Sequence, residues 1–590
     1  MVLNNRADNQ DKKNQHSSIV LEDGSRIGVI GGGPAGAFFS YFALILAKRT
    51  GIQIVVDIYE RRDFATFGPT GCNMCAGVIS ESLIQALSVE GIELPSDIVQ
   101  RGMNSFVLHT SSETVTMYAP FREMRIATVY RGGGPKGASQ VHWKSFDDYL
   151  LQLANANGAN IIRGKVTDIT WNGDKPQVHV SEKQQVYDLI VGAVGVNSPS
   201  PGLFEKLGFG YQRPKARKTF NCELELGSDF VTKELGTSMH AFLLNIPKLE
   251  FAAIVPKWNY ATMCLIGDDM DTAVLESFKQ HRVVRNTVSN SDVNSVIACN
   301  CAPLASLGQA VQPYGDRVVL LGDCGMSRLN KDGIGSAYRT AKVAAVTALF
   351  TGVAADDFRS YFWPRCKSIH TDNQFGRILY FAIDLVKKSD LLTRGVMWMT
   401  KKEQLKPGKQ RRMSMVLWNM FTGSAPYREI FISSLHPAFI ANFSCSSLLG
   451  LVRKVEPAQN IKDIEETVME KNVLGKVYNS GEIIVRQGDK GNCMYVIQSG
   501  KAEVLRVTKD NEELRLATLS KGDIFGEMAL FQEETRAATV RALGDVRVIT
   551  VDKRIFLRRV HEDPSFAFTV LQKMSQRIRD LNDKMAGTKA

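Results

Sequence analysis

The stretch Ile27-Gly28-Val29-Ile30-Gly31-Gly32-Gly33-Pro34-Ala35-Gly36 decides the fold of the first part of this 590-residue chain. A short apolar run leads into a glycine-rich turn, and residues 37–47 then have the composition of an apolar helix. This is the strand–turn–helix context in which Gly-x-Gly-x-x-Gly binds a dinucleotide. Gly31 permits the tight turn, Gly33 lets the backbone approach a pyrophosphate, and Gly36 allows close helix–strand packing. The helix N-terminus then offers free N–H groups to the phosphates.

An acidic residue follows the next predicted strand, residues 54–59. Glu60 lies 24 residues after Gly36, near the spacing of the acid that accepts a ribose hydroxyl in dinucleotide sites. Arg61 stands beside it and is a further candidate cofactor ligand. The alternative is a glycine-rich turn without a ligand, but strand, helix and acid together favour a dinucleotide site.

Two later segments indicate which dinucleotide is bound. Residues 187–195 are an apolar strand closing on a glycine-rich turn, and residues 316–323 are a strand ending in Gly322-Asp323. Gly333-Ile334-Gly335 then opens a helical run. In this order the motifs resemble the FAD-binding fold of the aromatic hydroxylases and geranylgeranyl reductases.

That resemblance implies FAD as the cofactor and a particular fold class. The expected fold is an α/β FAD-binding Rossmann-type domain with a mixed α+β substrate region. Asp323 would hold the flavin ribityl chain, and the helix N-terminus at Gly333 would face the flavin ring and the pyrophosphate.

The substrate half matches the reductases only in part. The loop Gly71–Gly77 resembles their cysteine- and glycine-bearing loop, and residues 251–256 loosely resemble their Tyr-x-Trp-x-Phe-Pro motif. Ala253 and Val255 stand where that motif has bulky rings, and no proline precedes Asp332-Gly333. The resemblance therefore implies a reduced-flavin reaction on an apolar, prenyl or quinone-like acceptor. The electron donor, NAD(P)H or a ferredoxin-like protein, stays open, and no spacing selects a proton donor among Tyr211, Tyr260 and Lys257.

Cys72 and Cys75 are the candidate catalytic residues, with three interpretations. They could form a redox-active dithiol beside the flavin. They could supply half of a metal site with Cys299 and Cys301, although this spacing is not typical of zinc and we predict no metal. They could also be part of a structural turn.

The C-terminal part has a different pattern. Residues 481–489, 494–500, 502–505 and 516–519 are typical of short strands separated by glycines, as in a β jelly roll. Residues 525–540 then strongly resemble the phosphate-binding cassette of cyclic-nucleotide-binding domains. A short helix beginning near Gly526 would present N–H groups to the cyclic phosphate. The candidate ligand-binding residues are Gly526, Glu527, Met528, Ala529, Arg536, Ala537 and Ala538.

The chemistry of two of these residues suits the ligand. Arg536 supplies a forked guanidinium for phosphate oxygens, and Glu527, nine residues earlier, can accept a ribose hydroxyl. Ala537 favours cAMP over cGMP, because kinase relatives that bind cGMP have Thr or Ser there. The alternative is a sandwich that keeps the fold without the ligand. A last helix beginning at Asp563-Pro564 and an amphipathic helix over Ile461–Val468 are candidates for transmitting the bound state.

The remaining predictions, on location and partners, rest on charge and composition. Ten scattered cysteines, the lack of an apolar signal region and the lack of a clean 20-residue apolar run predict a cytoplasmic protein. Lys387–Arg412 contains nine Lys/Arg and two acids, and Trp398 and Trp418 lie in or beside it. Such a segment could lie on an anionic bilayer at the inner face of the membrane, or present a solvated basic face. We expect no nucleic-acid partner.

These observations predict a mobile polar tail (1–24), an FAD-binding and substrate domain (25–375), a helical basic segment (376–455) and a cyclic-nucleotide-binding domain (456–590). The predicted function is an FAD-dependent reductase regulated allosterically by cyclic nucleotide. The alternatives are a flavin monooxygenase on the same fold and a signalling protein without turnover.

Overall fold

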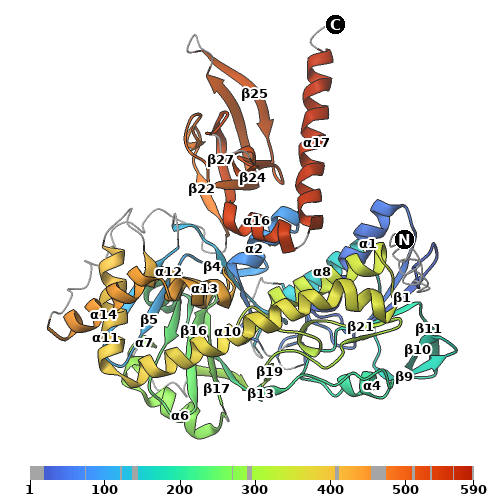
Figure 1. Ribbon diagram of the computed structural model, residues 1–590, viewed down its shortest axis with the longest axis horizontal. Helices are drawn as coiled ribbons and strands as arrows, with labels where there is room; N and C mark the ends of the chain where they lie inside the picture. Colours follow the sequence, from blue (N-terminus) through green and yellow to red (C-terminus); the bar gives the residue numbers. More distant parts are fainter. Residues whose placement is uncertain are drawn as a thin grey trace, which may run out of the picture.

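The computed structural model describes residues 19–587 except 69, 73–74, 120–121, 136–143, 269, 289–295, 406–410, 453–472, 508–511, 532–534 and 563. The predicted helix at Ile461–Val468, most of the tail 1–24, Asn73 and Met74 of the cysteine loop, and Asp563 lie outside the described residues. Figure 1 shows a body of two lobes with the C-terminal domain standing on it.

The first lobe contains a six-stranded sheet in the order β20-β21-β12-β1-β2-β8. Its strands are β1 (Arg26–Ile30), β2 (Val55–Tyr59), β8 (Asn160–Ile162), β12 (Leu189–Gly192), β20 (Tyr314–Gly315) and β21 (Val318–Leu320). All neighbours are parallel except β20 and β21. The central strands are apolar because both faces of a parallel sheet are covered.

Three helices and a small sheet cover those faces. The helices α1 (Pro34–Thr50), α3 (Phe146–Ala156) and α8 (Gly333–Phe350) share one apolar core with the sheet. The other face packs against the antiparallel strands β9 (Val166–Asn172), β10 (Lys175–Val180) and β11 (Lys183–Val186). The predicted α/β Rossmann-type fold is confirmed for this lobe.

The second lobe is a seven-stranded sheet in the order β18-β14-β17-β16-β15-β5-β6. Its strands are β5 (Ser105–His109), β6 (Thr114–Tyr118), β14 (Phe220–Glu225), β15 (Ser238–Phe242), β16 (Leu249–Pro256), β17 (Tyr260–Gly267) and β18 (Ile297–Cys301). One face packs against α6 (Thr272–Gln280) and α7 (Arg282–Thr287). The other face packs against α11 (Asp390–Gln404), α12 (Arg412–Thr422) and α14 (Pro437–Val452). This is the mixed α+β region expected from the sequence.

Several elements join the two lobes. The helix α10 (Trp363–Lys388) runs along both of them and continues through residue 375 (Figure 1). It contacts α13 (Tyr427–Ser434). The sheet β3 (Val78–Ile79), β7 (Ile126–Val129) and β4 (Val99–Met103), the pair β13 (Ala216–Lys218) and β19 (Leu304–Ser306), and the helix α2 (Glu81–Glu90) complete the connection. No helix in the described part of the chain has the length and apolar character needed to cross a membrane.

The C-terminal domain is antiparallel. It contains β22 (Lys476–Tyr478), β23 (Ile483–Val485), β24 (Cys493–Val507), β25 (Glu513–Leu519), β26 (Ile524–Phe525) and β27 (Thr539–Asp552). The strands predicted at 494–500 and 502–505 are one strand, β24. Gly500 adopts a φ of 83° there, and the register to β27 shifts around Ser499, so the glycine marks an irregularity within a strand and not its end. The helices α15 (Met528–Phe531), α16 (Lys553–Glu562) and α17 (Pro564–Gly587) complete the domain.

Candidate functional site

A cavity of about 910 Å³ lies where the two lobes of the body meet. Its lining comes from the ends of β1, β2, β12 and β21, from the first turns of α1 and α8, and from β15, β16 and β17 of the second sheet. The parallel strands therefore point their carboxyl ends at the cavity, which is where ligands bind in open α/β sheets.

The glycine-rich turn is as tight as its sequence predicts. Gly31 has a φ of 104°, and a Cβ there would lie 2.4 Å from the carbonyl oxygen of Ala193. A Cβ on Gly36 would lie 2.0 Å from the carbonyl oxygen of Gly31. Gly31 and Gly33 line the cavity, whereas Gly36 supports the turn from behind. Gly33 is the N-cap of α1 and supplies no side-chain cap, so the first turn of the helix is open to a ligand.

Glu60 lies buried directly after β2, and its carboxylate stabilises this turn by hydrogen bonds. One carboxylate oxygen accepts the N–H of Gly32 at 2.9 Å, and the other accepts the N–H of Arg62 at 2.9 Å. Glu60 and Arg61 both line the cavity, with Arg61 exposed. Each carboxylate oxygen has a second lone pair for a hydroxyl group.

Gly322 and Asp323 form a short 3₁₀ turn after β21. Gly322 has a φ of 60°, and a Cβ there would lie 3.0 Å from the Cβ of Ala35 in the first turn of α1. Gly322, Asp323, Gly333 and Ile334 line the cavity. Gly335 does not, because it lies against Asp332, where a Cβ would meet the carboxylate at 2.1 Å.

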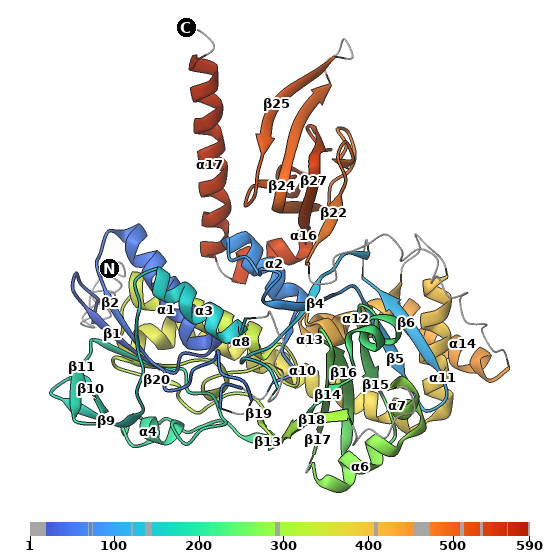
Figure 2. The same ribbon diagram turned by 180° about the vertical axis from the view of Figure 1, so that it is seen from behind.

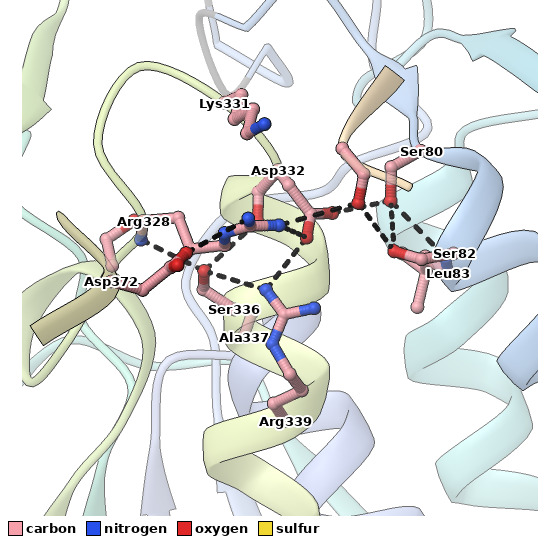
Figure 3. Close-up of polar contacts among 12 residues, drawn as sticks. Ser80, Ser82, Leu83, Arg328, Lys331, Asp332, Ser336, Ala337, Arg339 and Asp372 are labelled. Carbon is pink, nitrogen blue, oxygen red and sulfur yellow. Dashed lines mark hydrogen bonds and ion pairs between the residues drawn. The ribbon is translucent and has the colours of Figure 1, made fainter. Parts of the chain in front are cut away.

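A buried charge network surrounds the N-terminus of α8 (Figure 3). Asp332, the left-handed N-cap residue, accepts hydrogen bonds from Ser80 at 2.6 Å, Arg339 at 2.8 Å and Arg328 at 3.4 Å. Burial opposes ionisation of Asp332, but Arg339 and Arg328, with the hydroxyl of Ser80, hold its pKa below the usual value. Arg328 also reaches Asp372 at 3.2 Å. The sequence motifs did not indicate this network, because Ser80 and Asp372 join it from segments distant in the sequence.

Lys331 is a second residue that the motifs did not indicate. Its ammonium lies 4.1 Å from the centre of the Tyr427 ring and donates to the carbonyl oxygen of Asn419 at 3.0 Å. Burial, followed by the neighbouring charge of Arg328, lowers the pKa of Lys331 well below its usual value. Because shifted pKa values gather at functional sites, Lys331, which lines the cavity, is a candidate acid–base group there.

The other end of the cavity is mostly apolar. Its lining includes Met239, Ala241, Phe251, Ala253, Val255 and Ile266 from the second sheet, and Tyr380, Met420 and Phe421 from the helices. Ala253 and Val255, the two positions at which the sequence lacks the bulky rings of the reductase motif, both line this end. The three candidate proton donors named from the sequence do not line the cavity. Tyr211 donates to the carbonyl oxygen of Cys324, and Lys257 pairs with Glu223.

Cys72 and Cys75 also line the cavity; both are half-buried, and neither is part of a disulfide. Cys299 and Cys301 lie on β18, where burial first, then Glu223 for Cys299 and Cys72 for Cys301, raises their pKa values to about 11 and about 12. Among the described residues, no group of three or more His, Cys, Asp or Glu is placed to hold a metal ion.

The second candidate site lies in the C-terminal domain. Arg536 is buried, and its guanidinium donates to the carbonyl oxygens of Gly526 at 2.7 Å and Cys493 at 2.8 Å. Glu527 is buried as well, 3.6 Å from the guanidinium of Arg577 on α17. Of the other candidates, Met528 and Ala537 are exposed, Ala538 is half-buried and Ala529 is buried. Arg536 and Glu527 thus lie beside the same turn, and α17 closes over it.

Comparison with known proteins identifies the class of the C-terminal domain. Residues 475–563 match the family model of the cyclic nucleotide-binding domain. The cAMP-dependent protein kinase regulatory subunits of Blastocladiella emersonii and Schizosaccharomyces pombe are 40% identical over 81 residues and 43% identical over 100 residues. These matches cover 14% and 17% of this chain, and about a fifth of each relative (20% and 21%). The cyclic AMP receptor protein of Thermus thermophilus is 30% identical over 105 residues, 18% of this chain and 49% of that protein.

Solved structures similar to the body include flavoproteins. A geranylgeranyl bacteriochlorophyll reductase-like protein from Thermoplasma acidophilum has a TM-score of 0.45 and 12% identity, covering 72% of this chain and 96% of that one. A flavoprotein/dehydrogenase from Cytophaga hutchinsonii has a TM-score of 0.48 and 14% identity, covering 72% and 99%. Halogenase PltM in complex with phloroglucinol and FAD has a TM-score of 0.45 and 15% identity, covering 72% and 91%. None of these likenesses bears on the activity of this chain.

Asp332→Asn should lower the thermal unfolding midpoint at neutral pH, because an amide removes the carboxylate that pairs with Arg339 and leaves Arg328 with Asp372 alone. Breaking a buried ion pair costs about 3–5 kcal/mol. The lowered pKa of Asp332 means that its stabilisation is full above the pKa of an unfolded aspartate, about 3.9, and is lost as the pH falls through the folded value.

The difference in unfolding midpoint between wild type and Asp332→Asn should therefore shrink in acid, as followed by circular dichroism. Asp268→Asn is the control, since that carboxylate is mostly exposed beside Arg217. It should change the midpoint little. A difference for Asp332→Asn that is constant down to the lowest pH tolerated by the fold would contradict the assignment.

Proposed function

We propose that this chain is an FAD-dependent oxidoreductase whose flavin site is regulated by a cyclic nucleotide bound to the C-terminal domain. The observation that carries the proposal is the convergence of two helix N-termini and two acids, Glu60 and Asp323, on one cavity with an apolar far end. A dinucleotide needs the polar end, and an apolar acceptor needs the other.

The residues present fit FAD. The turn Gly31–Gly33 and the open first turn of α1 would receive the pyrophosphate, and Glu60 would accept a ribose hydroxyl. Asp323 would bind the ribityl hydroxyls, and the N-terminus of α8 at Gly333 would face the ring. When bound, FAD supplies hydride and electron transfer.

The chain itself would bind the acceptor and exclude water. The apolar lining from β15 to β17 suits a prenyl or quinone-like molecule, and it removes water from the reacting face. Lys331 is placed to hold or give a proton at this end of the cavity. Cys72 and Cys75 could exchange electrons with the flavin as a dithiol. The donor of the reducing equivalents, NAD(P)H or a ferredoxin-like protein, is not assigned.

The cyclic nucleotide would bind at Glu527 and Arg536. The guanidinium lies between Gly491 and Gly526, where any Cβ would clash with it, so the glycines hold it close to the backbone turn. A cyclic phosphate that enters this turn would compete with the carbonyl oxygens that Arg536 now contacts. Ala537 favours cAMP over cGMP.

Purified protein should carry a flavin absorbance spectrum and release FAD, identified by mass, on denaturation. Gly36→Val should reduce the bound FAD strongly, because the added side chain would push Gly31 out of the turn. Gly202→Ala is the control, since its Cβ would meet only the ends of the Arg213 and Glu205 side chains. Wild-type protein that takes up no FAD would refute the proposal, and a long-lived hydroperoxyflavin on mixing reduced protein with oxygen would favour a monooxygenase.

Arg536→Ala should weaken cAMP binding by about 100-fold, as measured by calorimetry, because a buried charged contact to the ligand is truncated. Arg536→Lys should also weaken binding while keeping the charge, since lysine lacks the planar fork. Arg541→Ala, five residues further on in β27 and paired with Glu503, should leave the affinity unchanged. The ligand assignment fails if Arg536→Ala binds cAMP like wild type.

We also propose a peripheral membrane contact at the inner face of a cytoplasmic membrane. The outer side of α10 exposes Ile378, Phe381 and Leu385 at helical spacing, with the exposed cations Arg377 and Lys388 at its two ends. Such a stripe suits an anionic lipid surface. Trp418, which the sequence suggested as part of this surface, is instead buried and donates to Glu81, because α12 packs this side against the sheet.

Protein should float with phosphatidylserine-rich vesicles at low salt, and Leu385→Asp should reduce the floating fraction. Leu514→Asp, at a similarly exposed leucine (54% against 49%) on β25, is the control and should float like wild type. Wild-type protein that stays at the bottom of the gradient at low salt rejects the membrane contact.

A further inference from the structure

The helix α2 belongs by sequence to the body, yet it completes the core of the C-terminal domain. Figure 2 shows α2 between the first lobe and the base of the C-terminal domain. Val89, near the end of α2, is fully buried in one apolar cluster with Met494, Val496, Phe556 and Val570. These partners lie on β24, α16 and α17. A movement of α16 or α17 therefore changes the packing around α2, since close-packed cores do not deform continuously.

Buried polar contacts join the same surfaces. Arg125 is 2% exposed, and its guanidinium reaches Glu81 of α2 at 2.7 Å and Asp552 of β27 at 2.9 Å. Glu123, paired with Arg125, accepts the N–H of Thr550 at 2.8 Å. Because truncating one member of a buried charge group is costly, these contacts fix the orientation of the C-terminal domain relative to α2.

A further contact comes from the helix that follows β27. Arg559 of α16 donates to the carbonyl oxygen of Ser82 in the first turn of α2 at 3.3 Å. Ser82 in turn donates to the carbonyl oxygen of Gly423, a residue that lines the cavity.

The opposite side of α2 is tied at both ends to α8. At its N-terminus the cap residue Ser80 donates to Asp332, the N-cap of α8 (Figure 3). At its C-terminus Glu90 forms an ion pair with the buried Lys342 of α8 and accepts from Tyr338 at 3.4 Å. A shift of α2 would therefore disturb its contacts with α8, the helix whose first turn lines the cavity.

The candidate nucleotide site connects to the same elements. Glu527, the acceptor for the ribose hydroxyl, faces Arg577 of α17, and Lys573 of α17 donates to the carbonyl oxygen of Gly522 at 2.6 Å. A ribose hydroxyl would compete with Arg577 for the carboxylate of Glu527 and so weaken the contact between Glu527 and α17. Val570 of α17 packs in the cluster that contains Val89.

We propose that α2 is the coupling element through which cyclic-nucleotide occupancy changes the N-terminus of α8, and with it the affinity of the flavin cavity. The inference rests on the proposed function, and it names the regulation of that site. A coupling of this kind is reciprocal: if cAMP changes FAD affinity by some factor, FAD changes cAMP affinity by the same factor.

The test measures FAD affinity by flavin fluorescence with and without saturating cAMP, and cAMP affinity by calorimetry with and without FAD. In wild type, the ratio of the FAD affinities with and without cAMP should equal the ratio of the cAMP affinities with and without FAD, and both should be at least about fivefold. Val89→Ala opens a cavity between α2 and the C-terminal domain and should bring both ratios close to one while each ligand still binds. Val284→Ala, an equally buried valine on α7 of the second lobe, carries a similar stability cost and should keep the wild-type ratio.

A second variant guards against loss of folding in Val89→Ala. Glu90→Gln keeps the shape and a hydrogen-bond acceptor but removes the charge that pairs with Lys342, and it too should lower the ratio.

Three contrary outcomes are distinguishable. Wild type that binds no FAD or no cAMP overturns both the proposed function and the coupling. Wild type that binds both with a ratio of one leaves the two sites standing and overturns the regulation. A wild-type ratio retained in both Val89→Ala and Glu90→Gln leaves the regulation standing and overturns the role of α2.

Discussion

The buried guanidinium of Arg125 is the contact on which the assembly of the chain depends. A charge removed from water must be paired, and the partners of Arg125 come from different parts of the molecule. They are Glu81 from α2, Glu123 two residues earlier in the sequence and Asp552 from the C-terminal domain. Glu81 also accepts the indole N–H of Trp418 from the helical segment. One side chain therefore holds the body, the helices and the C-terminal domain in a single arrangement, because any rearrangement that separates them leaves a charge buried without its partners.

The cavity follows from a second constraint, the meeting of two sheets of different character. The parallel strands end in turns of backbone N–H groups and acids, whereas the mixed sheet of the second lobe faces the cavity with alanine, methionine and valine side chains. A polar end and an apolar end thus lie within one cavity. The cations Arg328 and Lys331 stand near the boundary between these two ends, where α8 begins. Burial lowers the pKa of Lys331, whereas for Arg328 the effect of burial is outweighed by Asp372 and Asp332, which raise its pKa.

Motifs of local geometry were predictable from the sequence. The glycines at 31, 33 and 36, the acid at 60 and the Gly322-Asp323 turn follow from steric rules that act within a few residues. The break predicted near Gly500 was wrong, because pairing with β27 overrides a glycine in the middle of a long strand. Tyr211, Tyr260 and Lys257 do not line the cavity. Their positions in the sequence do not show in which direction each side chain points in the folded chain.

The sequence by itself determined the two classes of ligand-binding segment: a dinucleotide-type strand–turn–helix at the start and a cyclic-nucleotide cassette near the end. Both are encoded in short runs, because backbone conformation and hydrogen-bonding groups are set locally. Only the tertiary structure decided which contacts join the two parts of the chain that carry them. Val89 in the C-terminal core, Ser80 against Asp332 and Glu90 against Lys342 are contacts between residues hundreds of positions apart or on separate elements. They exist because buried apolar surface and buried charge must find partners wherever the folded chain brings them.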